Sequence, residues 1–315
     1  MDIILHLGAH RTASTSFQTY LRQNAAALAA QGVVSWGPRE TRNGLFHGIW
    51  PAPGEGLDER DSRRAAGRIA LALSAVRRGG ARSLIVSDEN FLGNPRALIR
   101  DAQLYPAAGE RLARLHGAFG GQISRLVLSI RSPDLFWPSL IAMTVGRGHP
   151  IPGPARLARM ADPARSWRDV ITDLACAMPD RPILVFPHET YGAVPERRLA
   201  RMLPRPLARL PLAHARLKLN ASLALPALRD ALAQAGRPDT EMPAGDGAYR
   251  PFDPGQTTLL RDAYRDDLFW LQAGADGLAQ LICDPMTGTE GQDPDRPNMQ
   301  RGQTDDRKGH VAQAG

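Results

Sequence analysis

Four short runs of hydrophobic residues stand out along the chain, and none of them alternates polar with apolar positions. They are Ile3–Leu7, Leu84–Val86, Leu126–Ile130 and Ile183–Phe186. Each run is too short for a buried helix, and a continuous hydrophobic run is typical of a strand covered on both faces of a parallel sheet. The pattern therefore predicts four buried parallel strands.

Hydrophobic residues at helical spacing lie between and after these runs. Directly after the first strand, one helical face carries Phe17, Tyr20, Leu21, Ala25 and Leu28. Further helices are predicted at residues 61–76, 135–143, 167–178, 221–235 and 257–273. Asp61 or Ser62 is the expected N-cap of the helix at 61–76. Alternation of strands and helices predicts an α/β domain with a parallel sheet flanked by helices.

Two regions break this alternation because they are rich in proline and glycine, at residues 35–59 and 146–163. Long loops in a compact α/β domain are usually functional lids or disordered insertions, so both regions are candidates for choosing a ligand. The end of the chain differs again, because residues 287–315 contain no aromatic residue, leucine or isoleucine. We therefore predict a folded domain at 1–285 and a disordered tail at 286–315.

Composition narrows the class of protein. The chain has 315 residues, of which 43% are hydrophobic, and no segment approaches the apolar length that spans a membrane. The first residues lack the basic stretch of a secretory signal, so we expect a cytoplasmic protein. Only two cysteines occur, Cys176 and Cys283, and no Cys/His cluster has metal-ligand spacing. We therefore expect neither a disulfide framework nor a bound metal.

The net charge of +7 has two interpretations, a scattered solvated surface or a preference for anionic ligands. Acidic residues are interleaved with basic ones along most of the chain, but the stretch from Arg197 to Lys218 contains seven cations and no acid. Residues 197–209 suit an amphipathic helix with a charged face. The same stretch has no aromatic residue among its cations, which disfavours nucleic acid as a partner.

The segment after the first strand carries the strongest chemical signal. Residues 8–16 are small, hydroxylated or basic, and a helix follows them. A strand, loop and helix in this order direct backbone N–H groups and the positive end of a helix dipole at a bound phosphate or sulfate. The segment is not a Walker A motif, since Ala13 and Ser14 occupy the positions of its second glycine and its lysine. The alternative is a capped helix whose hydroxyl groups serve only the backbone.

The five residues 11–15, Arg-Thr-Ala-Ser-Thr, resemble the phosphosulfate-binding loop of the sulfotransferase superfamily, which typically reads K-[ST]-G-[ST]-[ST] after the first strand. Arg11 stands for the lysine and Ala13 for the glycine. His6 and Gly8 upstream and Gln18 downstream are similar to a wider form found in bacterial sulfotransferase-like proteins. The resemblance extends over roughly residues 3–280, with its specificity concentrated in two motifs.

The second motif is an arginine at the end of a strand with a serine eight residues later. Arg131 follows the strand at Leu126–Ile130, and Ser139 lies in the next predicted helix. In sulfotransferases such a pair binds the 3′-phosphate of the donor nucleotide, where arginine supplies a planar two-donor fork. The alternative is an arginine capped by the carbonyl groups around the strand end.

The resemblance implies a P-loop-like fold and an activity. It implies that 3′-phosphoadenylyl sulfate (PAPS) is the donor and that a sulfuryl group passes to a hydroxyl or amine without a metal. Arg11 would stabilise charge on the leaving group, and Arg216 or Lys218 would cover the 3′-phosphate. The residues expected to surround the 5′-phosphosulfate are Thr12, Ala13, Ser14, Thr15 and Ser16.

A general base must accept the proton of the acceptor. Glu89 is the first candidate because it follows the strand at Leu84–Val86, and reactive groups in parallel sheets gather at the carboxyl ends of strands. The alternative is a capping or solvated acid. His47, in the first irregular region, is the rival base. His10 is a weaker candidate for lining the site, and Glu189 is expected to be a structural acid.

Two other functions remain open from the sequence. Arg11 and Ala13 depart from the usual lysine and glycine, which is compatible with a non-catalytic protein that binds PAPS, adenosine 3′,5′-bisphosphate or sulfate. A divergent P-loop kinase is the third hypothesis. For an active enzyme, the expected acceptor is a carbohydrate or another hydroxylated small molecule, by analogy alone. The sequence predicts no oligomeric state.

Overall fold

A parallel sheet of six strands organises the described part of the chain, which comprises residues 1–50, 58–162, 164–237 and 242–283. In this computed structural model the strands lie in the order β2-β3-β1-β4-β5-β6. Their bounds are β1 Asp2–His6, β2 Val33–Trp36, β3 Ser83–Ser87, β4 Arg125–Ile130, β5 Ile183–Pro187 and β6 Gln280–Leu281. Residues 1–282 form one compact unit, and the tail predicted at 286–315 lies outside the described residues.

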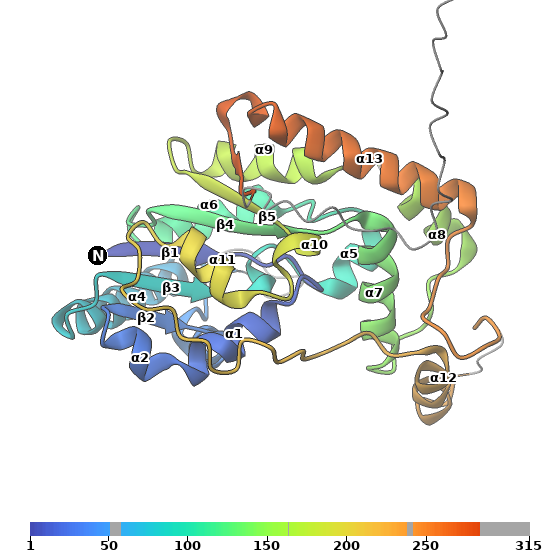
Figure 1. Ribbon diagram of the computed structural model, residues 1–315, viewed down its shortest axis with the longest axis horizontal. Helices are drawn as coiled ribbons and strands as arrows, with labels where there is room; N and C mark the ends of the chain where they lie inside the picture. Colours follow the sequence, from blue (N-terminus) through green and yellow to red (C-terminus); the bar gives the residue numbers. More distant parts are fainter. Residues whose placement is uncertain (51–57, 163, 238–241, 284–315) are drawn as a thin grey trace, which may run out of the picture. The chain divides into compact units, whose positions relative to one another are not determined.

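Helices cover both faces of the sheet. Successive residues of each strand point to opposite sides, and since both sets are hydrophobic, both faces must be buried. Ile3 and Leu5 of β1 belong to one hydrophobic core and Ile4 to the other. The first core also contains residues of α4 (Glu59–Arg78), α6 (Ala108–Ala118), α9 (Trp167–Ala177) and α13 (Pro254–Gln272). The second contains residues of α1 (Ser14–Gln23), α2 (Ala25–Ala29) and α11 (Pro195–Met202). Figure 1 shows α9 and α13 on one side of the sheet and α1 and α2 on the other.

Helix α7 (Pro133–Val145) begins directly after β4 and is buried along most of its length. Phe136 packs within 5.7 Å of the Trp167 ring and 6.3 Å of the Tyr105 ring, measured between centroids. Such aromatic packing fixes the helix against the carboxyl edge of the sheet. Ser139, which is itself buried, is therefore held at a defined place beside the end of β1.

The remaining helices are short and connect these layers. They are α3 (Pro38–Glu40), α5 (Pro95–Asp101), α8 (Pro154–Ala161), α10 (His188–Tyr191), α12 (Leu225–Gln234), the π-helical turn η1 (Thr41–Leu45) and the 3₁₀ turns η2 (Glu89–Phe91) and η3 (Ala275–Gly277). Within the described residues, both regions expected to be irregular contain some of these helices. Figure 1 shows a long irregular segment between α11 and α12 that passes beside α1.

The four predicted strands and the α/β class are confirmed, with three corrections. Strands β2 and β6 were not predicted, because they are short and lie at the edges of the sheet. Helix α4 begins at Glu59, and its cap is Asp58, whose side chain accepts a hydrogen bond from the Arg60 N–H, so Asp61 and Ser62 are not its cap. The charged helix expected at 197–209 ends at Met202, where Leu203 adopts an extended conformation.

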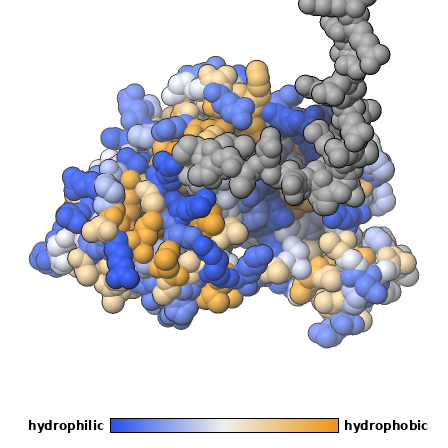
Figure 2. Space-filling view, in the orientation of Figure 1, coloured by the Kyte–Doolittle hydropathy of each residue, from blue (hydrophilic) through white to orange (hydrophobic). Residues whose placement is uncertain are grey.

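Hydrophilic and hydrophobic residues are intermixed on the face drawn in Figure 2. This agrees with charges that are interleaved along most of the sequence. Among the described residues, no helix is both long enough and apolar enough to cross a membrane.

Candidate functional site

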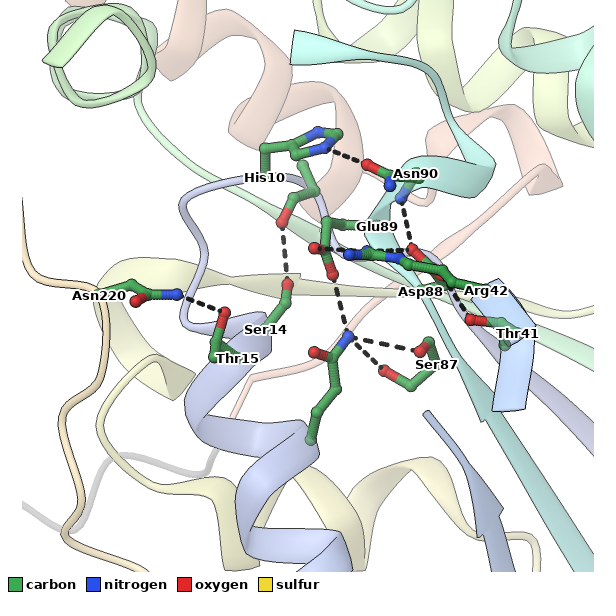
Figure 3. A network of polar contacts seen from close by, with 12 residues as sticks. His10, Ser14, Thr15, Thr41, Arg42, Ser87, Asp88, Glu89, Asn90 and Asn220 are labelled. Atoms are coloured by element: carbon green, nitrogen blue, oxygen red, sulfur yellow. Dashed lines mark hydrogen bonds and ion pairs between the residues drawn. The ribbon is translucent and has the colours of Figure 1, made fainter. Parts of the chain in front are cut away.

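The loop between β1 and α1 is folded back on itself by its own hydroxyl groups. Thr12 Oγ1 donates to the Ala9 carbonyl at 2.7 Å. Ser14 Oγ donates to the same oxygen at 3.0 Å, and Figure 3 draws this second contact. The Ala9 N–H in turn donates to the Ser129 carbonyl of β4 at 2.8 Å. The loop is thus a rigid extension of the sheet, and Thr12 and Ser14 serve its backbone.

Two residues of this loop other than glycine have left-handed backbone conformations. Arg11 has φ 59° and Ala13, which precedes α1, has φ 63°. A side chain with a Cβ atom is strained in this region, whereas glycine is not. The alanine in place of the glycine of the sulfotransferase motif therefore keeps the loop geometry at a cost in stability.

We expect Ala13→Gly to stabilise the protein. Relief of the left-handed alanine contributes about 1–2 kcal/mol, and the added freedom of the unfolded chain removes about 0.4–1 kcal/mol of it. Urea denaturation should show a net gain of about 0.5–1 kcal/mol. The control is Ala27→Gly in the exposed middle of α2, which should lose about 1 kcal/mol. Equal losses in both variants would contradict the strained conformation of Ala13.

A cavity of about 460 Å³ opens beside this loop. It brings together most of the residues expected to bind the nucleotide. They are Arg11, Ala13, Thr15, Ser16, Arg131, Ser139, Arg216 and Lys218. The convergence follows from the topology, because β1 and β4 are neighbouring parallel strands and their carboxyl ends meet at one edge of the sheet. Thr12 and Ser14 do not line the cavity.

Arg131 and Arg11 link the two sequence motifs directly. Arg131 Nη1 donates to the Arg11 carbonyl at 2.9 Å, and Arg11 Nε donates to Ser139 Oγ at 2.8 Å. Ser222, which the sequence analysis did not identify as a site residue, completes this cluster. Its hydroxyl lies 2.7 Å from Ser139 Oγ and accepts from Arg11 Nη2 at 3.1 Å.

The opposite wall of the cavity is the covering segment, residues 215–222, which crosses the start of α1. The Leu219 N–H donates to Ser16 Oγ at 3.0 Å. Asn220 Nδ2 donates to Thr15 Oγ1 at 3.0 Å, as Figure 3 shows. The residues that make these contacts are about 200 positions apart in the sequence, so no local sequence pattern predicts the contacts. The polar residues of the covering segment, Arg216, Lys218, Asn220 and Ser222, are exposed and line the cavity.

The two basic residues predicted to cover a phosphate belong to this segment. Arg216 is largely exposed, and its Nη1 lies 2.9 Å from Glu196 Oε1, so an acid already compensates part of its charge. Lys218 is exposed, and its side chain has no partner among the described residues. Lys218 is therefore the freer of the two for a ligand.

Positive charge accumulates around the loop. Burial, followed by the charges of Arg131 and Arg147, lowers the pKa of Arg11 to about 10. Burial also lowers the pKa of Arg198 to about 10. Arg198 Nη2 donates to the carbonyls of Thr12 (3.2 Å) and Tyr191 (3.1 Å), while its Nε and Nη1 have no hydrogen-bond partner within the described ranges. Arg198 does not line the cavity, but a buried cation beneath the loop adds to the positive potential there, which favours a bound anion.

Glu189 lies on the cavity wall but is held by the protein. Its Oε1 accepts from the Ser132 N–H at 3.0 Å and its Oε2 from the Tyr264 hydroxyl at 2.9 Å. The neighbouring His188 also lines the cavity, and burial, followed by the charge of Arg131, lowers its pKa to about 4. Both carboxylate oxygens of Glu189 are thus engaged by the protein, and the lowered pKa keeps His188 neutral at physiological pH.

Glu89 lies on the other side of the loop, in a second cavity of about 190 Å³ that also includes His10. The turn η2 positions it immediately after β3, and its Oε2 accepts from Gln18 Nε2 at 2.9 Å. Its Oε1 accepts from Arg42 Nη2 at 3.0 Å (Figure 3). A Cβ atom on Gly8 would lie 2.7 Å from the Glu89 Cβ, so the glycine allows this carboxylate to approach the loop.

The two histidine candidates have different positions. His47 is exposed, its carbonyl accepts a hydrogen bond from Arg68, and it lines neither of these two cavities. The geometry therefore gives no support to His47 as the base. His10 is buried between the Tyr105 hydroxyl (2.8 Å) and Asn90 Oδ1 (3.1 Å), and burial lowers its pKa. Of the two candidate histidines, His10 is the one that lines the same cavity as Glu89.

Below the loop, His6 makes stability depend on pH. Its Nδ1 lies 2.8 Å from Ser87 Oγ, and burial, followed by the charge of Arg198, holds its pKa well below 6.5. Below about pH 6.5 the unfolded chain binds a proton that folded His6 excludes, so stability falls as pH falls. Urea denaturation at pH 7.5 and pH 5 should show a loss up to about 2 kcal/mol larger in the unaltered protein than in His6→Asn. Identical pH dependence in the two proteins would contradict this.

The described residues contain no group of three or more His, Cys, Asp or Glu side chains arranged to hold a metal ion. No protein-family model matches the sequence, and its comparison with curated proteins finds no significant match.

Proposed function

We propose that the protein is a PAPS-dependent sulfotransferase with the P-loop-like fold of that superfamily, and that the larger cavity takes the donor. The observation that carries this proposal is the meeting of the two sequence motifs. Arg131 contacts the Arg11 carbonyl and Arg11 contacts Ser139, although the motifs are about 120 residues apart. An anion-binding loop and a two-donor arginine on one cavity suit a ligand with two separate phosphate groups.

The size and charge of the cavity support this donor. A volume of about 460 Å³ lies in the range of roughly 300–1,000 Å³ that small-molecule sites occupy. The 5′-phosphosulfate would lie against the start of α1, near Thr15 and Ser16, and the 3′-phosphate near Arg131 and Ser139. Lys218 of the covering segment would add a further positive charge. Several cations in a partly closed space favour a polyanionic nucleotide.

In the proposed reaction the acceptor oxygen attacks the sulfur atom in line with the leaving phosphate oxygen. The bond between sulfur and that phosphate oxygen breaks as the new sulfur–oxygen bond forms. Glu89 takes the acceptor proton, while Arg11 and the N–H groups of α1 stabilise the negative charge on the departing phosphate. Arg11 acts by its charge, because an arginine side chain is a poor proton donor.

One observation favours a second function, that of a binding protein without turnover. Arg11 is engaged by Ser139 and Ser222, so its guanidinium must change partners to reach a leaving group. The kinase hypothesis is weaker, because the hydroxyl of Ser14, at the position of the Walker lysine, is directed to the Ala9 carbonyl.

Titration calorimetry with adenosine 3′,5′-bisphosphate, compared with Mg-ATP, tests the proposal. We expect binding of the bisphosphate in the micromolar range or tighter and no magnesium-dependent binding of ATP. Transfer of labelled sulfate from PAPS to a panel of carbohydrate and phenolic acceptors then separates an enzyme from a binding protein. Absence of bisphosphate binding would overturn the proposed function, and binding without transfer would favour the second function.

A further inference from the structure

The second cavity is lined by a different set of residues from the first. Its lining includes the acid Glu89, the histidines His10 and His149, and the arginines Arg96 and Arg147. His10 and the adjacent Arg11 line different cavities, so the loop separates the two spaces. Helix α7 borders both, through Ser139 on the first and Met143 and Thr144 on the second. The second cavity therefore lies across the loop from the proposed donor site.

The charges on this lining do not balance. Arg42 is held by Asp88 at 2.6 Å and by Glu89 at 3.0 Å, so its charge is compensated. Arg96 and Arg147 are exposed, and neither side chain has an acidic or hydrogen-bonding partner in the described parts of the chain. Arg147 is close enough to Arg11 to disfavour its protonated form. The cavity thus combines one carboxylate with two uncompensated arginines near the proposed point of transfer.

We propose that this second cavity binds the acceptor and selects a small hydroxylated molecule that carries a negatively charged group. The inference rests on the proposed sulfuryl transfer. Arg96 and Arg147 would bind the charged group, and Glu89 would face the reacting hydroxyl. The Oδ1 atoms of Asn90 and Asn94 already accept from His10 and from the Arg96 N–H, so their Nδ2 groups would donate to further hydroxyls. A volume of about 190 Å³ is below the roughly 300 Å³ of drug-sized sites, so it suits a single sugar-sized unit.

Binding of matched probes tests the inference independently of turnover. The protein is first saturated with adenosine 3′,5′-bisphosphate. If the bisphosphate does not bind, that result contradicts the proposed function and not the choice of acceptor. Methyl β-D-glucuronide is then compared with methyl β-D-glucoside, and glucose 6-phosphate with glucose. We expect at least one charged probe to bind about tenfold more tightly than its neutral partner, as charge-assisted hydrogen bonds allow. The pair that shows the preference identifies carboxylate or phosphate as the recognised group.

The variant Arg147→Gln tests whether the preference comes from this cavity. It should bind the charged probe about tenfold more weakly and the neutral probe equally well, with bisphosphate affinity within about twofold of the unaltered protein. The control is Arg78→Gln, an exposed arginine of α4 that contacts Ser74 of the same helix, and it should keep the preference. Equal affinity for charged and neutral probes, no binding of either charged probe, or a preference that survives Arg147→Gln would each overturn the inference.

Discussion

Arg131→Ala is expected to bind adenosine 3′,5′-bisphosphate roughly ten- to a hundredfold more weakly than the unaltered protein. The arginine lies at the end of β4, where its Nη1 donates to the Arg11 carbonyl at 2.9 Å and its Nε has no partner among the residues the structure describes. The substitution removes both a two-donor fork for the phosphate and a contact that orders the loop. Loss of charge-assisted hydrogen bonds accounts for roughly 1.5–3 kcal/mol.

Two further variants separate charge from geometry at this position. Arg131→Lys keeps the charge but not the planar fork, so its affinity should be intermediate. Arg125→Ala removes an arginine from the opposite end of the same strand, where it donates to the Met202 carbonyl, and it should leave affinity unchanged. Calorimetry on all three variants, after denaturation has shown that each is folded, makes the comparison. If Arg131→Ala bound the bisphosphate as tightly as Arg125→Ala, Arg131 would have no role in the donor site.

The central strands were predictable because they are buried on both faces. Ile3 to Leu5 and Leu84 to Val86 are fully covered, so selection for hydrophobic residues acts at every position and leaves a continuous run. The edge strand Val33–Trp36 has two partly exposed residues among its four, and this weak signal does not stand out from a loop. The α/β class therefore followed from the pattern, whereas the full width of the sheet did not.

In the site, too, features encoded by neighbouring residues were predictable, whereas contacts between residues distant in the sequence were not. The loop at 8–16 was recognisable from its sequence because a strand, small residues and a helix follow one another directly. Its contact with the covering segment joins Thr15 to Asn220, and only the tertiary fold brings them together. Likewise, the sequence does not show where the side chain of a loop histidine points, which is why His47 was a candidate although it lines neither cavity.

The sequence around Arg198 contains a pattern that indicates its burial, although the sequence analysis did not use it. Arg198 belongs to a stretch of seven cations that was interpreted as a charged surface, yet it is 1% exposed. Pro195, Leu199 and Met202, at helical spacing around it, are also buried. Position 198 therefore lies on the apolar face of α11, and an arginine there indicates a buried cation that needs carbonyl or anionic partners.

The largest effect on turnover is expected from Glu89→Gln. A general base contributes roughly a hundred- to ten-thousandfold to the rate, so sulfate transfer should fall by about that factor. Glutamine has nearly the same shape, and its oxygen can still accept from Gln18 or Arg42, so the second cavity should keep its form. Affinity for adenosine 3′,5′-bisphosphate should stay within about twofold, because Glu89 does not line the donor cavity.

The neighbouring carboxylate supplies the control for Glu89. Asp88 is 2% exposed and lines neither cavity. Both of its carboxylate oxygens accept hydrogen bonds from Arg42, and Oδ2 also accepts one from the Thr41 hydroxyl. Asp88→Asn should therefore lower the free energy of unfolding while retaining far more activity than Glu89→Gln, when transfer is measured well below the melting temperature. A loss of activity that tracked stability in both variants would assign Glu89 to the structural network. Full activity in Glu89→Gln would instead mean that the acceptor proton leaves by another group, for which His10, a histidine that lines the same cavity, is the next to test.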